Sequence, residues 1–239
     1  MADFTVQYDG DVAVVTMDDG KANALTLPEF DSLDRALAAV ESSRALSMVL
    51  VGRPGYFSAG LNLKVLPTLP VSDVRKLIAR FGEVALRLFL FPKPVVAAVT
   101  GHALGAGGMF AWAADERVQA EGAFKFGLNE VPAGLFVPTF GIEIARASAP
   151  AWMLTQLLVH GRVLSPDEQK GYRMATVVEP AKVLETAMAR AVELSVLSGT
   201  GYALTKKLVR GPAAEVARIQ LPHEIDALAM SLEGKSKTL

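Results

Sequence analysis

Short apolar runs and helical periodicities alternate along the chain. Strands are predicted where β-branched or apolar runs lie between turn residues: residues 4–8, 12–17, 46–51, 95–99, 116–120 and 124–126. Helices are predicted where apolar side chains recur at spacings of three and four: residues 27–40, 72–90, 184–197 and 202–209. The first two strands are expected to form a hairpin, and the runs at 46–51 and 95–99 are typical of strands buried in a parallel sheet.

Two capping boxes mark helix starts. Thr26 is followed by Glu29, and Ser165 is followed by Glu168 with Pro166 at the first helical position. From residue 180 onward the pattern is almost entirely helical, and the sequence contains neither an internal repeat nor a low-complexity linker. Strand-helix alternation followed by a helical tail predicts a layered α/β fold with right-handed crossovers.

The amino-acid composition argues against several classes of function. The chain has 239 residues and 51% hydrophobic content, with 24 Lys and Arg against 25 Asp and Glu, so it lacks the charge excess of a general nucleic-acid binder. No cysteine is present, which excludes disulfides, thiolate zinc sites and cysteine nucleophiles, and three scattered histidines argue against a metal site. Residues 1–5 do not resemble a signal peptide, and charges interrupt the longest apolar stretches, so we expect a cytoplasmic protein that does not span a membrane.

Two loops rich in Gly and Ala follow two of the predicted buried strands, at residues 57–63 and 101–108. Small residues allow the backbone to approach a ligand, and the free N–H groups at a helix start bind anions or developing oxyanions. Close packing of strand against helix explains the same composition. Neither loop carries a phosphate-binding signature, so nucleotide binding is disfavoured.

Four blocks of sequence, taken together, resemble the crotonase (enoyl-CoA hydratase/isomerase) superfamily over about residues 5–210. The blocks occur in the family's order: residues 21–25 (KANAL), 57–64 (FSAGLNLK), 92–105 (PKPVVAAVTGHALG) and 126–130 (FGLNE). The resemblance implies an α/β spiral of ββα units over residues 1–195, and a shortened C-terminal helical region for trimerisation over residues 196–239. It also implies an acyl-CoA substrate and no other cofactor, a homotrimer or dimer of trimers, and a lyase or isomerase of fatty acid metabolism.

The resemblance also implies roles for individual residues. The N–H groups of Leu61 and Ala106 correspond to the family's oxyanion hole, and Glu130 corresponds to its catalytic acid/base. Substrate and coenzyme A contacts are implied for eight further residues: Lys21, Ala22, Ala24, Ala59, Gly60, Lys64, Gly105 and Met109. Solvated surface positions explain the two lysines equally well, and a structural role is expected for His102.

The chain departs from the family at one catalytic position. Hydratases of the family use two glutamates, and Met109 stands where the first is expected, whereas Glu130 retains the second. A single carboxylate suits double-bond isomerisation, because the same group removes and returns a proton, whereas hydration needs a positioned water. Glu143 is a possible substitute for the missing carboxylate, and a solvated helix surface explains it as well. Lys206 and Lys207 are expected to be solvated helix charges.

Enoyl-CoA isomerisation or hydration is therefore the leading hypothesis from the sequence. A non-catalytic acyl-CoA-binding protein, motivated by Met109, and another crotonase reaction such as thioester hydrolysis or decarboxylation stay open as alternatives.

Overall fold

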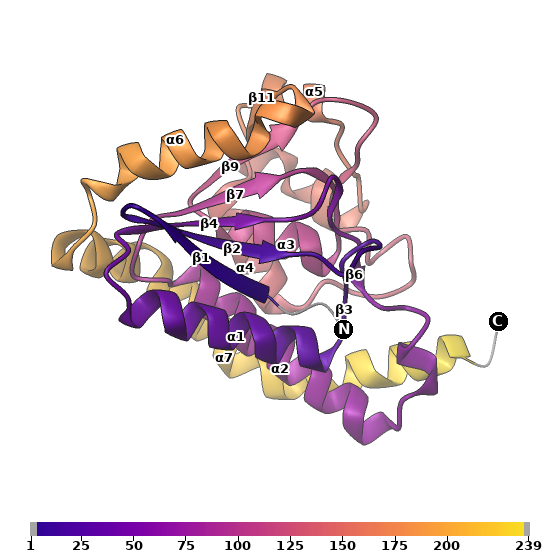
Figure 1. Ribbon diagram of the computed structural model, residues 1–239. Helices are drawn as coiled ribbons and strands as arrows, with labels where there is room; N and C mark the ends of the chain where they lie inside the picture. The colour runs from indigo at the N-terminus through magenta and orange to yellow at the C-terminus, as the bar shows by residue number, and fades with distance from the viewer. Residues whose placement is uncertain (1–3, 237–239) are drawn as a thin grey trace.

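The computed structural model describes residues 4–236, and its central feature is a six-stranded sheet in the order β1-β2-β4-β7-β9-β11 (Figure 1). Its strands are β1 (Phe4–Asp9), β2 (Val12–Met17), β4 (Ser47–Val51), β7 (Val95–Val99), β9 (Glu116–Ala120) and β11 (Thr176–Val178). The first pair is antiparallel and every other pair is parallel. The predicted hairpin and the strands predicted within this sheet are confirmed, and β11 is an additional strand.

Two smaller sheets accompany the six-stranded sheet. A three-stranded parallel sheet has the order β10-β8-β5, and a two-stranded pair joins β3 to β6. Their strands are β3 (Ala24–Leu25), β5 (Gly55–Ser58), β6 (Gly60–Leu61), β8 (Gly101–Leu104) and β10 (Phe126–Gly127). The strand predicted over 124–126 thus begins at Phe126.

Seven α-helices and several single turns complete the described part of the chain. The helices are α1 (Leu27–Ser42), α2 (Val71–Phe89), α3 (Ala106–Ala113), α4 (Thr139–Ser148), α5 (Pro166–Gly171), α6 (Val183–Ser195) and α7 (Thr200–Ser236). The turns are 3₁₀ segments Leu66–Thr68, Ala151–Met153 and Pro180–Lys182 and a π segment Thr155–Val159. Both predicted capping boxes are present at the starts of α1 and α5. Within residues 4–236, no helix has both the length and the apolar character needed to cross a membrane.

The order of elements contains three ββα units: β4-β5-α2, β7-β8-α3 and β9-β10-α4. In each unit the first strand lies in the large sheet and the second in the small sheet, so successive units wind as a spiral. The spiral implied by the resemblance is therefore present, although the sequence shows no repeat. The three units share the same order of strands and helix, but different apolar residues build them. The structure therefore repeats although the sequence does not.

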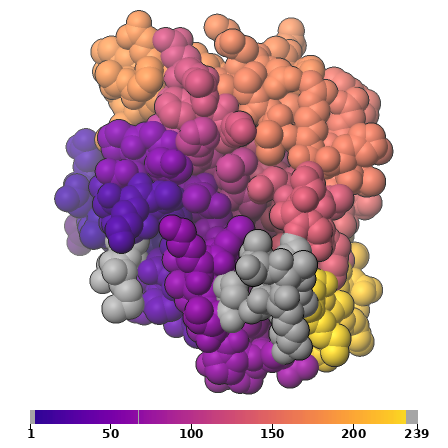
Figure 2. Space-filling model, turned by 90° about the vertical axis from the view of Figure 1, so that its right-hand side faces the viewer, coloured from indigo at the N-terminus to yellow at the C-terminus, as the bar shows by residue number. Residues whose placement is uncertain are grey.

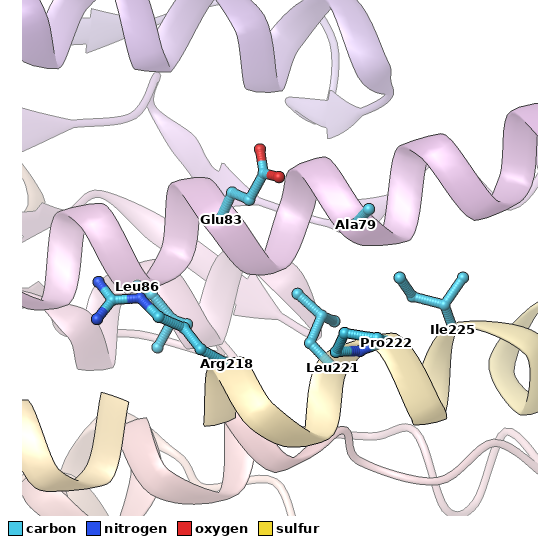
Figure 3. Close-up of a pocket in the computed structure, with 7 residues that line it drawn as sticks. All are labelled: Ala79, Glu83, Leu86, Arg218, Leu221, Pro222 and Ile225. Carbon is cyan, nitrogen blue, oxygen red and sulfur yellow. The ribbon is translucent and has the colours of Figure 1, made fainter. Parts of the chain in front are cut away.

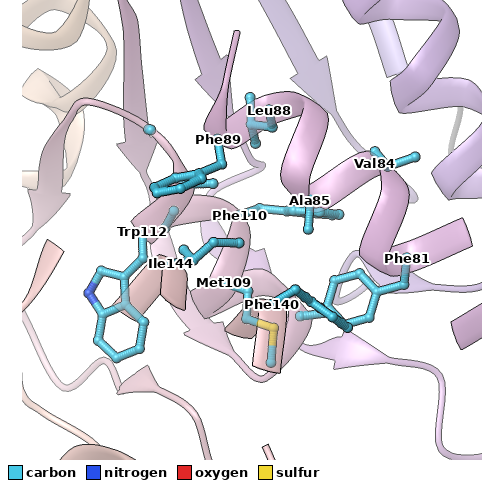
Figure 4. Close-up of a cluster of buried hydrophobic side chains, with 14 of the residues drawn as sticks. Phe81, Val84, Ala85, Leu88, Phe89, Met109, Phe110, Trp112, Phe140 and Ile144 are labelled. Atoms are coloured by element: carbon cyan, nitrogen blue, oxygen red, sulfur yellow. The ribbon is translucent and has the colours of Figure 1, made fainter. Parts of the chain in front are cut away.

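The main core lies on one face of the large sheet, under α1 to α4. Four phenylalanine rings meet there. The ring centroids of Phe30 and Phe81 are 5.1 Å apart. The ring of Phe81 also lies 5.7 Å from that of Phe110 and 4.9 Å from that of Phe140, and Figure 4 shows these three side chains. A smaller apolar cluster on the opposite face packs the sheet against α6. Covering both faces explains why β7 is apolar at every position and β4 at every position after Ser47.

A buried ion cluster fixes α7 to the sheet and corrects the expectation for Lys206. The residue is only 7% exposed, and its amine donates to the Asp115 carboxylate over 2.9 Å. Asp115 also accepts from the Tyr202 hydroxyl and pairs with Arg210. The expectation of a solvated Lys206 is wrong because its partner is far away in sequence. Lys207, one position on, is exposed.

Candidate active site

The first Gly/Ala-rich loop is held by side chains that bond to backbone. Asn23 is fully buried in a left-handed conformation (φ 51°), and its amide donates to the carbonyl oxygens of Met17 and Phe57. The Ser58 hydroxyl donates to the Asn23 carbonyl and accepts from the N–H of Gly60. Because these groups are buried and bonded, the loop has a fixed conformation.

The two Gly/Ala-rich loops touch at Gly60. A methyl group at this position would lie 2.6 Å from the carbonyl oxygen of Leu104 and 3.2 Å from the nitrogen of Ala106, and φ is 84°. Only glycine fits both the conformation and the contact. This close approach brings the backbone of Leu61 beside the start of α3.

Two N–H groups at this contact are available to a ligand. Asn62 donates its N–H to Leu25 of β3, and because successive strand N–H groups point in opposite directions, that of Leu61 faces away from β3. Ala106 is the first residue of α3, where N–H groups have no partner within the helix. Two backbone N–H groups close to each other are what an oxyanion hole requires.

Glu130 reaches the same place from the loop after β10. That loop is anchored where Gly105 donates to Gly127 and Leu135 donates to the carbonyl of Glu130. The carboxylate Oε1 lies 3.5 Å from the point where a side chain on Gly105 would begin, and Oε2 is buried without a hydrogen bond. Burial raises the pKa of Glu130 to about 7, because the charged form loses its hydration.

These groups share one cavity of about 80 Å³. Nine residues line it: Ala59, Leu61, Leu63, Gly105, Ala106, Asn129, Glu130, Ala133 and Leu135. Figure 2 views the molecule from the side at which β3 and β6 lie, where the segments coloured purple and pink meet. The carboxylate of Glu130 and the amide of Asn129 are the only polar side-chain groups among these lining residues.

Comparison with known proteins identifies the family. A family model described as enoyl-CoA hydratase/isomerase matches residues 7–235. The chain belongs to the enoyl-CoA hydratase/isomerase family. It is 30% identical over 188 residues to a probable enoyl-CoA hydratase of Bacillus subtilis, covering 77% of this chain and 72% of the relative.

Solved structures agree with this family assignment. An enoyl-CoA hydratase/isomerase family protein from Pseudomonas syringae superposes with a TM-score of 0.88 at 26% identity, covering 94% of this chain and 97% of the other. Human mitochondrial Δ3-Δ2-enoyl-CoA isomerase has the same fold, with a TM-score of 0.89 at 23% identity, covering 98% and 97% of the two chains. The protein is thus an acyl-CoA enzyme of the enoyl-CoA hydratase/isomerase family with a crotonase fold.

Most site residues inferred from the family resemblance come together in the structure. Glu130, Leu61, Ala106, Ala59 and Gly105 line the cavity. Gly60 lies within the first loop, and two more residues lie directly beside it. Ala22 accepts the N–H of Ala59, and Ala24 pairs with Gly60 in the β3-β6 ladder. The sequence analysis did not select four of the lining residues: Leu63, Asn129, Ala133 and Leu135. Leu63 and Asn129 each lie next to a residue that it had selected, whereas Ala133 and Leu135 do not.

Other candidate residues lie outside the cavity. Met109 is 1% exposed, and its sulfur and methyl group pack against Gly141 of α4 rather than facing the cavity (Figure 4). Glu143 pairs with Arg146 on α4 and is not a lining residue, so it does not replace the missing carboxylate. The side chains of Lys21 and Lys64 are exposed and do not line it either.

His102 has a structural environment, as expected for this family position. Its Nδ1 accepts the N–H of Lys125, and its ring contacts Tyr56 and Phe124. Burial lowers the pKa of this imidazole, with a smaller contribution from the positive charge of Lys125. Within residues 4–236 no group of three or more metal-ligating side chains is present.

A larger cavity of about 500 Å³ lies elsewhere, between α2 and α7 (Figure 3). Its lining is mainly apolar, with Glu83 and Arg218 at its edges. The residues that line this larger cavity include no buried carboxylate. The smaller cavity, in contrast, is lined by Glu130, whose Oε2 is buried without a hydrogen bond.

The raised pKa of Glu130 has a measurable effect on stability. A carboxyl group whose pKa is raised by folding stabilises the fold while protonated, and this contribution is lost as the pH rises through about 7. We expect Glu130→Gln to raise the free energy of unfolding by about 1–3 kcal/mol at pH 8 and to change it little at pH 4. Urea unfolding at both pH values measures this, and equal effects at the two values would contradict the burial of the charge.

Proposed function

We propose that the protein moves the double bond of an enoyl-CoA thioester, with Glu130 as the single acid/base. The observation that carries the proposal is that Glu130 has the only carboxylate among the residues lining the cavity, with one oxygen buried and unbonded. A carboxylate with a pKa near 7 exists in both protonation states at neutral pH. One group can therefore remove a proton and return it.

The steps follow from the positions of the groups. The thioester oxygen accepts hydrogen bonds from the N–H groups of Leu61 and Ala106, and the Glu130 carboxylate removes a proton from C2 of a 3-enoyl thioester. The C–H electron pair forms a C1–C2 double bond as the carbonyl pair moves onto the thioester oxygen, which gives a dienolate that still contains the C3–C4 double bond. On protonation at C4 the C3–C4 pair bonds the proton, the C1–C2 pair becomes the C2–C3 double bond, and the carbonyl forms again. Glu130, now a carboxylic acid, returns the proton to C4 and leaves a 2-enoyl thioester. Each hydrogen-bond donor to the oxygen contributes about 10²–10³-fold to the rate.

Hydration of a 2-enoyl thioester is the second candidate. The Bacillus subtilis relative is named a probable enoyl-CoA hydratase, and the Asn129 amide offers a second polar group in the cavity. An amide can hold a water molecule but cannot take its proton. Hydration is therefore expected to be the slower reaction on this site.

Parallel turnover assays on 3-enoyl and 2-enoyl thioesters of equal chain length test the proposal. We expect isomerisation to exceed hydration by at least about 10-fold, since proton return by one carboxylate needs no positioned water. Faster hydration would overturn the choice of reaction. The absence of both activities, with thioester binding retained, would favour a non-catalytic acyl-CoA-binding protein.

We further propose that the protein assembles as a homotrimer or a dimer of trimers. Large apolar side chains on α6 and the segment after it are exposed: Leu184 is 43% exposed, Val192 56% and Leu197 55%. α7 exposes Leu208 at 76% and Val209 at 73%. Association would remove this apolar surface from water. Light scattering at micromolar concentration is expected to give a multiple of three chains, and a monomer would contradict the proposal.

A further inference from the structure

The cavity that holds Glu130 is small for an acyl-binding site. Its volume is about 80 Å³. An apolar cavity of about 150 Å³ in another protein binds benzene, which has six carbons. On that scale the cavity here accommodates about three or four carbon atoms.

The inner wall of the cavity is closed by the core. Leu61 and Leu135 line the cavity, and both also pack against the main apolar cluster. That cluster contains Phe81, whose ring makes edge-to-face contacts with the rings of Phe110 and Phe140, and all three are fully or almost fully buried (Figure 4). A chain that extended past Leu61 and Leu135 would have to enter this close-packed core.

The outer side of the cavity is open. Ala59 is exposed and Leu63 is 62% exposed, so the coenzyme A part of a substrate can enter beside them. The thioester carbonyl lies at the N–H groups of Leu61 and Ala106. Ala133 and Leu135 also line the cavity, and Leu135 is the one of the two that packs on the core.

We propose that the enzyme is selective for short acyl thioesters of about four carbons, and that Leu135 is the residue against which the acyl chain ends. The proposal rests on the proposed function, because it takes the thioester oxygen to be held by the two backbone donors. Leu135 is fixed from both sides, since its N–H donates to the Glu130 carbonyl over 2.9 Å and its side chain packs on the core. The limit on chain length is therefore tied to the loop that carries the acid/base.

Rates on substrates of different length test this selectivity. We expect kcat/KM for a four-carbon enoyl-CoA to exceed that for a ten-carbon enoyl-CoA by at least about 100-fold, since each surplus methylene in a filled apolar pocket lowers the rate by about 10-fold or more until the chain is excluded. Calorimetry with butanoyl-CoA and decanoyl-CoA measures the same preference without turnover. Equal or better rates and affinities for the ten-carbon compounds would overturn the proposal.

A pair of matched variants tests the role of Leu135. Leu135→Ala is expected to raise the ratio of ten-carbon to four-carbon kcat/KM by at least about 10-fold, because it removes the end wall. Leu90→Ala removes the same atoms from another partly buried leucine that packs on the same core but does not line the cavity, and it should leave the ratio unchanged. An unchanged ratio in Leu135→Ala, or the same change in both variants, would overturn the assignment of Leu135.

The tests separate failure of this inference from failure of the proposed function. If no thioester of any length is turned over but butanoyl-CoA binds more tightly than decanoyl-CoA, the reaction is wrong and the chain-length selectivity stands. If turnover occurs with no preference for short chains, the selectivity is wrong and the reaction stands. If neither acyl-CoA binds, both are wrong.

Discussion

Replacing Glu130 with Gln is expected to lower turnover of the preferred enoyl-CoA by about 10²–10⁴-fold while changing thioester affinity by no more than a few fold. The amide keeps the shape of the side chain and its capacity for hydrogen bonding, but it cannot take a proton. The structure strengthens this expectation because Glu130 has the only carboxylate among the nine lining residues. Calorimetry measures affinity, and isomerase and hydratase rates are measured side by side.

Glu143→Gln is the matched control, since Glu143 is the other carboxylate selected from the sequence and it pairs with Arg146 outside the cavity. We expect its turnover to match that of the wild type. A Glu130→Gln enzyme that keeps more than about a tenth of the wild-type rate would rule out Glu130 as the acid/base. A wild type without turnover on any thioester would instead favour the binding-protein alternative.

Replacing Asp115 with Ala is expected to lower the free energy of unfolding by about 3–5 kcal/mol. The side chains of Lys206 and Arg210 are only 5% and 13% exposed, and both pair with this carboxylate. Asp115 also accepts from the N–H of Val95 and the hydroxyl of Tyr202, each over 2.8 Å. Its removal leaves two buried cations and two buried donors without their shared acceptor. Urea unfolding at neutral pH measures the change.

Asp226→Ala provides the comparison for this cluster. Asp226 also joins α7 to another element, through a 2.7 Å ion pair with Arg75, but the two side chains are 66% and 44% exposed. Solvent screens such a pair, so its loss should change the free energy of unfolding by less than about 1 kcal/mol. Similar effects of the two substitutions would show that burial does not set the strength of the Asp115 cluster.

The fold could be predicted from the sequence to a large extent because its signals are local. The capping boxes at Thr26 and Ser165 each involve residues only three positions apart. The buried strands at 46–51 and 95–99 can be recognised because almost all of their residues are apolar. The boundaries of short strands were predicted less accurately than those of long ones, as the strand predicted over 124–126 shows. Phe126 and Gly127 form a strand only because β8 lies beside them.

The candidate site was predictable in part, for a different reason. Gly60, Gly105 and Glu130 belong to blocks that resemble a known family, and the structure brings the three together at the contact between two loops. Asn129 and Ala133 carried no signal of their own. Their position on the cavity follows from the path of the loop that Leu135 closes onto Glu130.

The sequence by itself determined the strands of the large sheet other than β11, the two Gly/Ala-rich loops and the choice of Glu130, since each depends on residues within one short segment. Only the tertiary structure decided that Lys206 is buried, because its partner Asp115 lies 91 residues away. It also decided that Met109 packs into the core against Gly141. The volume of the cavity could not be predicted from the sequence for the same reason. The cavity is the space left between loops and a helix start that come from distant parts of the chain. Close packing fixes that space only when all of these parts are assembled.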